Sequence, residues 1–277
     1  MLYGCAASAQ LRQEPDLVNW FLGTVGFSYK DWDGVFYPEG APARSYLAHY
    51  SQVFNAVEVD STFYGTPPPE RVRGWAGAVP KGFKFCPKMP RQITHDSRLQ
   101  NAHRPTQEFI ETMTLFDDKL GAILIQLPPN FTAAEFDSVA QFLADLPPDL
   151  DFALEFRHQS WFNFETVALL KSHGVCWVST EYLDLPKQIA LTTPFHYIRW
   201  LGRHGQFERK NQVQKDVLPQ LDWWWQHIQP NLERVHTIYG FFNNDFSGHS
   251  PETCNRFKQL VGLPIITPQL PQQRTLF

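Results

Sequence analysis

The chain has 277 residues, of which 43% are hydrophobic and 15% aromatic, a composition that argues against disorder and suits one large domain. Its formal net charge of −4 gives no general attraction to nucleic acid or to acidic membranes. Four widely spaced cysteines without a CxxC pair indicate reduced thiols, not a disulfide framework. Because the sequence contains neither a membrane-length apolar run nor a signal peptide, we expect a cytoplasmic protein with no membrane partner.

Apolar, strand-like segments alternate with amphipathic segments from residue 21 onwards. The strand-like segments are the eight ranges 21–29, 56–64, 82–88, 121–127, 151–157, 175–180, 195–201 and 237–244. Apolar residues recur with helical spacing in the ranges 43–54, 69–79, 106–120, 132–146, 165–173, 215–228 and 250–261. The range 181–194 contains two prolines, which predicts little or no helix there.

This alternation predicts an α/β protein built from parallel βα units. The simplest closed form is a (β/α)8 TIM-like barrel with one irregular βα unit at residues 181–194. An open, doubly wound parallel sheet is the alternative. We assign residues 1–20 to an N-terminal extension and residues 21–277 to a single barrel domain.

Charged and amide side chains gather at the ends of the predicted strands. Because alternate residues of a strand share a face, Phe152 and Leu154 should point to the helices, and Glu155 and Arg157 to the barrel axis. The same reasoning predicts inward positions on five other strands for Glu58, Asp60, Lys88, Gln126, Arg199 and Asn243. These positions lie towards the carboxyl ends of their strands, where (β/α)8 enzymes build their active sites.

Two loops extend this charged mouth. The range 202–216 follows the seventh strand and is rich in Arg, Lys and His, and the range 243–252 delivers His249 to a helix N-terminus. Loops after the last two strands of this fold commonly bind phosphate, because free backbone N–H groups and the helix dipole attract anions. A solvated surface loop followed by an ordinary helix cap is the alternative interpretation.

The charged mouth also has a purely structural interpretation, in which three acids and three bases form an ion network without a ligand. The members would be Glu58, Asp60, Glu155, Lys88, Arg157 and Arg199. Stability alone is a weak reason for such a network, whereas cooperating charges in a cleft are a common functional signature. A divalent metal is an alternative that we do not favour, because the histidines are scattered and show no HxH or HExxH spacing.

Several segments taken together are similar to those of one protein family. They include "GFSYKDWDGVFYP" (26–38), "FNAVEVDSTFYGTPPPE" (54–70), "FKFCPKMPRQITH" (83–95), "LEFRHQSWF" (154–162) and "FNNDFSGHSP" (242–251). From about residue 22 to its end, the chain thus resembles the uncharacterised DUF72 family, also called YecE-like. The resemblance implies a TIM-like barrel and no settled activity. Asp60 and Phe27 stand where the family usually has Asn and Trp.

The first functional hypothesis is an enzyme or binding protein for a small ligand that carries phosphate or carboxylate. Arg157, Arg199 and Lys88 would hold the anion, since Arg forks match oxyanions in geometry. Glu58 and Glu155 would form an acid/base pair, as in a hydrolase. The remaining predicted site residues are a proton-shuttling His158 and the ligand contacts Tyr29, Tyr64, Gln126, Asn243 and His249.

Two alternatives come from other classes of protein. The family's barrel has been likened to metal-dependent phosphodiesterases of the endonuclease IV kind, which implies a nucleic-acid partner and a basic, aromatic-lined groove. The candidates for that groove are Tyr29, Trp32, Phe63, Tyr64, Arg91 and the loop 203–215. Strong salt dependence of binding would identify it. A non-catalytic ligand sensor would use the same pocket without turnover. The sequence predicts neither the substrate nor the oligomeric state.

Overall fold

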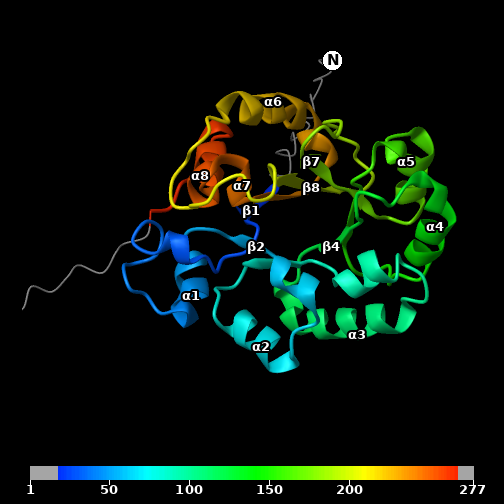
Figure 1. The fold of residues 1–277 in the computed structure, drawn as a ribbon, viewed down its shortest axis with the longest axis horizontal. Coiled ribbons are helices and arrows are strands. Elements are labelled where there is room, and N and C mark those ends of the chain that lie inside the picture. Colours follow the sequence, from blue (N-terminus) through cyan, green and yellow to red (C-terminus); the bar gives the residue numbers. More distant parts are fainter. Residues whose placement is uncertain (1–17, 268–277) are drawn as a thin grey trace, which may run out of the picture.

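The computed structural model describes residues 18–267, and its strands form three sheets in which every pairing is parallel (Figure 1). The first sheet, in the order β1-β9-β8-β7, consists of Asn19–Thr24, Thr237–Phe242, Phe195–Trp200 and Ser179–Glu181. The second sheet pairs β2 with β3, which are Ala56–Val59 and Lys84–Pro87. The third, in the order β4-β5-β6, consists of Ile123–Gln126, Phe152–Glu155 and Cys176–Trp177.

Eight α-helices of the described chain lie around the periphery of these strands (Figure 1). In chain order, α1 to α8 are Tyr46–Tyr50, Pro69–Gly77, His103–Met113, Phe136–Ala144, Phe164–Ser172, Leu218–Ile228, Asn244–Ser247 and Ser250–Leu260. Strands and helices therefore alternate as the sequence predicts, and the architecture is α/β with parallel strands. The connection between β7 and β8, residues 182–194, contains no helix, which confirms the predicted irregular unit.

The core has two parts, and strand β5 shows how they are divided. Phe152 and Leu154 belong to the large apolar cluster that also holds Leu170 of α5, so this cluster lies between strands and helices. Ala153 belongs to a second, smaller cluster on the opposite face of the strands. Because side chains alternate along a strand, Glu155 shares the face of Ala153. The predicted inward direction of Glu155 is confirmed.

The predicted closed (β/α)8 barrel is confirmed only in its coarser features. Within residues 18–267, the hydrogen-bonded ladders fall into three sheets and do not close into one. Single parallel bridges join neighbouring sheets, at Val25 with Glu58 and at Lys88 with Leu124. Strands β2 and β3, of 4 residues each, pair with each other along their whole length and, among the described residues, meet the neighbouring sheets only through such bridges.

The strand predicted at residues 56–64 is wrong in its second half. Strand β2 ends at Val59, and the chain continues as a 3-10 helix over Asp60–Tyr64. The Thr62 hydroxyl lies 2.7 Å from the carbonyl oxygens of both Val59 and Lys88, so it satisfies groups that a longer strand would have paired. The predicted strand 175–180 is likewise divided, because β6 pairs with β5 whereas β7 pairs with β8. The predicted N-terminal extension lies mostly outside the described residues, and β1 already begins at Asn19.

Candidate functional site

A cleft of about 390 Å³ lies at the carboxyl ends of the parallel strands. Its walls come from segments at or after the ends of β1, β2, β3, β5, β7, β8 and β9, which are far apart in the sequence. The lining residues are Val25, Tyr29, Asp60, Phe63, Tyr64, Lys88, Arg157, Tyr182, Arg199, Leu201, Gly202, His204, Lys210, Asn243 and Asp245. Ligand sites of parallel α/β proteins form at this end of the strands, so the convergence identifies the cleft as the candidate site.

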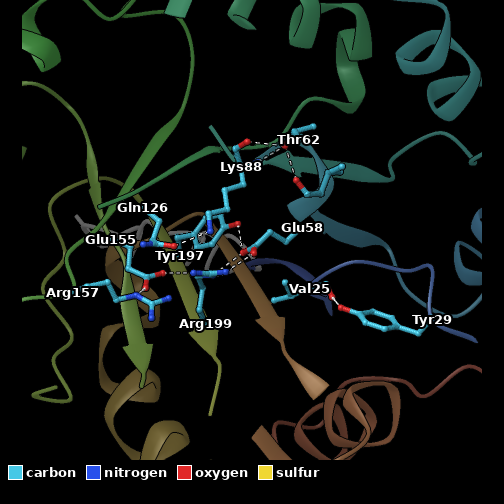
Figure 2. Close-up of polar contacts among 11 residues, drawn as sticks. Val25, Tyr29, Glu58, Thr62, Lys88, Gln126, Glu155, Arg157, Tyr197 and Arg199 are labelled. Atoms are coloured by element: carbon cyan, nitrogen blue, oxygen red, sulfur yellow. Dashed lines mark hydrogen bonds and ion pairs between the residues drawn. The ribbon is translucent and has the colours of Figure 1, made fainter. Parts of the chain in front are cut away.

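The base of the cleft is a buried ion network, which we call the floor network and which consists of Glu58, Glu155, Tyr197 and Arg199. The Arg199 guanidinium lies between the two carboxylates and donates to both (Figure 2). Its Nη2 lies 2.6 Å from Glu58 Oε1, and its Nε lies 2.8 Å from Glu58 Oε2. The Tyr197 hydroxyl donates to Glu58 Oε2 at 3.0 Å. Both glutamates are 0% exposed and Arg199 is 3% exposed.

Charge pairing in the floor network outweighs the cost of burial. Burial alone would raise the pKa of Glu155, but Arg157 and Arg199 lower it below its ordinary value. Burial would likewise lower the pKa of Arg199, whereas Glu155 and Glu58 raise it. Every carboxylate oxygen of the two glutamates already has a guanidinium or hydroxyl partner. Both carboxylates are therefore satisfied, by Arg199 and Tyr197 within the floor network and by Arg157 beside it.

Arg157 stands at the edge of the cleft between a carboxylate and an aromatic ring. Its Nε donates to Glu155 Oε1, and its guanidinium carbon lies 3.7 Å from the centre of the Tyr182 ring. Within residues 18–267 its two terminal nitrogens have no hydrogen-bond partner. A guanidinium that is held at one nitrogen and stacked on one face keeps its remaining N–H groups for a ligand.

Lys88 follows β3 and reaches over the floor network (Figure 2). Its Nζ lies 2.7 Å from Gln126 Oε1 and 3.9 Å from the centre of the Phe63 ring. In the described part of the chain it forms no ion pair with a carboxylate. Burial, followed by repulsion from Arg199, lowers the pKa of Lys88 from 10.5 to about 8. Lys88 is therefore a desolvated amine without a counter-ion.

Asp60 lines the cleft beside Tyr29. Burial, and then repulsion from Glu58, raises the pKa of Asp60 above its ordinary value. The Tyr29 hydroxyl donates to the carbonyl oxygen of Val25 at 2.7 Å, and burial raises its pKa, with a further contribution from Asp60. Gly26 has a φ of +72°, and a Cβ there would lie 3.0 Å from Asp60 Oδ1, so this close approach requires glycine.

The predicted basic loop at 202–216 contributes two side chains to the cleft wall. His204 Nδ1 and Lys210 Nζ each lie 3.7 Å from a carboxylate oxygen of Asp245, which is 3% exposed. The backbone N–H of Gly205 donates to the same carboxylate at 3.0 Å. At Gly202, with a φ of +74°, a Cβ would lie 2.0 Å from the Asp245 carbonyl oxygen, so no side chain fits. Asp245 therefore fixes this loop over the cleft.

Most of the predicted site residues meet at the cleft, and two do not. Those at the cleft or its floor are Glu58, Glu155, Lys88, Arg157, Arg199, Asn243, Tyr29, Tyr64 and Gln126. His158 caps a short 3-10 helix and accepts from the Ser160 N–H at 3.2 Å, because the residue after an inward-pointing one faces the other way. His249 is buried against Trp32, with ring centres 6.2 Å apart.

Two residues of the site, Tyr182 and Asp245, were not predicted from the sequence, and Phe63 was expected only as an aromatic of the nucleic-acid groove. Phe63 lies against the Lys88 amine, Tyr182 stacks on Arg157, and Asp245 anchors the basic loop. The position of Tyr182 could have been predicted, because Tyr182 lies two residues after Thr180, the last residue of a predicted strand, and would continue its face. The other two lie on the helical turns that follow β2 and β9, where strand alternation no longer applies.

Other features of the described chain compete less well as the site. No group of three or more His, Cys, Asp or Glu side chains in residues 18–267 is arranged to hold a metal ion. A larger cavity of about 760 Å³ lies between α3 and α4, but its lining comes from those helices and adjoining loops and not from strand ends. A third cavity, of about 500 Å³, shares Tyr29 and Asp60 with the cleft and extends towards Arg71 and Trp75.

Fold and site together define a parallel α/β protein with a charged cleft at the carboxyl ends of its strands. Residues 21–275 match the profile of the family described as "Protein of unknown function DUF72". The chain belongs to the DUF72 family, which confirms the resemblance found in its motifs. None of the described helices is both long and apolar enough to cross a membrane.

Relatives of known sequence or structure agree with this assignment. The UPF0759 protein YunF of Bacillus subtilis (strain 168) is 24% identical over 273 residues, which cover 88% of this chain and 95% of YunF. The UPF0759 protein YecE of Escherichia coli (strain K12) is 33% identical over 116 residues, 42% of this chain and less than half (43%) of YecE.

Two crystal structures of DUF72 family proteins have a similar fold. The protein from Thermotoga maritima MSB8 gives a TM-score of 0.77 at 26% identity and covers 88% of this chain and 99% of its own. The protein from Enterococcus faecalis V583 has a TM-score of 0.73 at 21% identity, and the match covers 90% of this chain and 100% of that protein. At this identity the similarity supports the fold alone.

Proposed function

We propose that the cleft binds a small ligand bearing phosphate or carboxylate and that the protein is an enzyme acting on this ligand. The observation that carries the proposal is that two cations of the cleft, Arg157 and Lys88, keep N–H donors that no carboxylate within residues 18–267 occupies. Arg157 keeps two terminal nitrogens free, and Lys88 forms no ion pair in the described chain. An oxyanion between them would receive charge-assisted hydrogen bonds from both.

The geometry does not favour the expected acid/base catalysis by Glu58 and Glu155. Glu58 and Glu155 have all their oxygens occupied, so we assign them the positioning of Arg199 and Arg157. Asp60 lines the cleft with a raised pKa, which suits a group that donates and accepts a proton. We therefore infer that Asp60 is the acid of this site.

The proposal also includes the closed (β/α)8 barrel that the sequence predicts. The bridges of Val25 with Glu58 and of Lys88 with Leu124 link successive sheets at the cleft end of the strands. We infer that the three sheets act as one (β/α)8 ring within a single domain over residues 21–277, with the cleft as its mouth. This arrangement would explain why residues from seven strand ends converge on one cleft.

Thermal unfolding with inorganic phosphate and with pyruvate tests the proposal. A ligand at 100 times its Kd stabilises a protein by about 2.7 kcal/mol, which raises the Tm of a chain this size by several degrees. We expect the wild type to be stabilised and Arg157→Ala to lose the effect. Arg104→Ala, on the exposed surface of α3, is the matched control and should keep it. A wild-type Tm that neither anion moves would contradict the proposal.

Nucleic-acid binding or phosphodiesterase activity is the second candidate, and one residue favours it. Tyr64 is 86% exposed at the edge of the cleft, near Lys88 and Arg157, as a stacking platform for a base would be. The net charge of −4 is unfavourable to it. A log–log dependence of affinity on salt with a slope of several units would favour this candidate. A sensor, the third candidate, would bind the anion and never turn it over.

A further inference from the structure

We propose that Lys88 is a nucleophile that forms an imine with the carbonyl carbon of its ligand. The ligand class is then a small aldehyde, ketone or 2-oxo acid that also carries the anionic group. This inference rests on the proposed function, because the anion held by Arg157 would bring the carbonyl carbon to the Lys88 amine. It specifies a covalent chemistry that anion binding alone does not require.

The first argument is the placement of the amine. Lys88 Nζ lies inside the cleft, with Gln126 Oε1 at 2.7 Å and the Phe63 ring centre at 3.9 Å. An amide oxygen and a ring orient an amine without neutralising its reactivity, as a carboxylate partner would. Lys84, on the same strand, shows the contrast, because its Nζ donates to two backbone carbonyls, at 2.7 and 3.1 Å, outside the cleft.

The second argument is how the nearby charges are distributed. The charges that act on Lys88 from neighbouring elements are those of Arg199, Glu58, Glu155 and Arg157. The two carboxylates are already paired with guanidinium groups, so they do not hold the amine in its protonated form by direct contact. Asp60 and His95 also interact electrostatically with Lys88, and the pKa of His95 is lowered to about 4 by burial and by Lys88.

These surroundings leave part of the amine neutral near neutral pH. Burial and Arg199 lower the pKa of Lys88 to about 8. Desolvation and neighbouring cations are the two means by which proteins activate lysine for imine formation. The neutral amine has the free electron pair that attack requires.

The step balances without an oxidant or reductant. The Nζ electron pair attacks the carbonyl carbon, a C–N bond forms, and the carbonyl oxygen takes a proton to give a carbinolamine. The nitrogen then loses a proton, its electron pair forms the C=N bond, and the hydroxyl leaves as water after it has been protonated. Asp60, which lines the same cleft, is the group that we assign to deliver this proton. One water is released for each imine formed.

Reductive trapping tests the inference on the full-length protein. The probes are pyruvate and glyceraldehyde 3-phosphate, with sodium cyanoborohydride to reduce any C=N bond to a stable amine. Intact-mass and peptide mapping should find one reduced adduct, on Lys88. Its rate should rise with pH and reach half its maximum at about pH 8. Adducts spread over surface lysines, or none with either probe, would overturn the inference.

Two variants separate chemistry from binding. Lys88→Arg keeps a cation but has no primary amine, so it should lose the adduct, whereas anion binding is judged on the wild type. Lys171→Met removes an exposed lysine of α5 and should still be labelled at Lys88. If the wild type binds anions without forming an adduct, only the imine inference fails. If it binds neither phosphate nor pyruvate, the proposed function fails with it.

Discussion

The floor of the cleft and its wall both contain acidic and basic residues, but in the described chain these are paired on the floor, whereas Lys88 and Asp60 on the wall are not. On the floor, Arg199 is shared by two carboxylates, and all of these groups are almost fully buried. On the wall, Lys88 and Asp60 are partly desolvated without direct partners of opposite charge. Pairing lowers the pKa of Glu155 and raises that of Arg199, whereas burial moves the pKa values of Lys88 and Asp60 towards neutrality. The difference indicates that the floor gives shape and the wall is available for chemistry.

The largest effect should come from breaking the floor. Arg199→Met would leave Glu58 and Glu155 buried with most of their partners gone, and removing one member of a buried pair costs about 3–5 kcal/mol. Urea unfolding should show a loss of that size in the free energy of unfolding. Arg104→Met, which removes an exposed ion pair, should change it by less than about 1 kcal/mol. A similar small change in both variants would mean that the floor network contributes little.

On the wall, Lys88 should make the free energy of unfolding depend on pH in the alkaline range. The folded pKa of Lys88, about 8, lies below its ordinary 10.5, so between these values the unfolded chain binds more protons. Stability that depends on Lys88 should therefore rise from pH 8 to 10.5, by up to about 3 kcal/mol at about 1.4 kcal/mol per pKa unit.

The measurement is the difference in unfolding free energy between the wild type and Lys88→Met across this range. The comparison cancels the titration of other groups. If this difference in unfolding free energy stays constant from pH 8 to 10.5, the Lys88 amine has an ordinary pKa and the prediction is wrong.

The sequence predicts which face of a strand a charged side chain occupies, but it does not predict which partner that side chain finds. The faces of Glu58 and Glu155 follow from the two-residue period of a strand, and their burial confirms it. Whether a charge finds a partner depends on residues from strands far apart in the chain, so pairing of Arg199 with both glutamates could not be read from any one segment.

Local turns limited the prediction in a second way. The hydroxyl of Thr62 ends β2 at Val59, so Asp60 and Tyr64 reach the cleft from a 3-10 helix instead of a strand. In the described chain, neighbouring sheets meet only at single bridges beyond or at the ends of short strands, and apolar runs do not define where such strands end. The alternation of strands and helices was therefore predictable, and closure of the sheets was not.

A smaller effect is expected at Asp60, with the opposite sign to Arg199. Its raised folded pKa means that the folded chain binds the proton more tightly, so the charged form destabilises the fold at pH 7. Asp60→Asn should therefore stabilise the protein at pH 7. The gain should disappear as the pH falls below the ordinary value of 3.8, where Asp60 is protonated in both states. Urea unfolding at pH 3.5 and 7 would show this, and destabilisation at pH 7 would contradict it.

The smallest effect on stability should come from Tyr64, and this makes it the cleanest probe of ligand class. Its side chain is 86% exposed, so Tyr64→Ala should change the unfolding free energy by less than about 0.5 kcal/mol. Phosphate and pyruvate should still stabilise this variant, because they are assigned to Arg157 and Lys88. If short single-stranded oligonucleotides bind the wild type with strong salt dependence and lose affinity in Tyr64→Ala, the exposed ring stacks on bases and the second candidate function gains over the first. If oligonucleotides bind neither protein, the second candidate function fails and the small-anion proposal stands on the phosphate and pyruvate result.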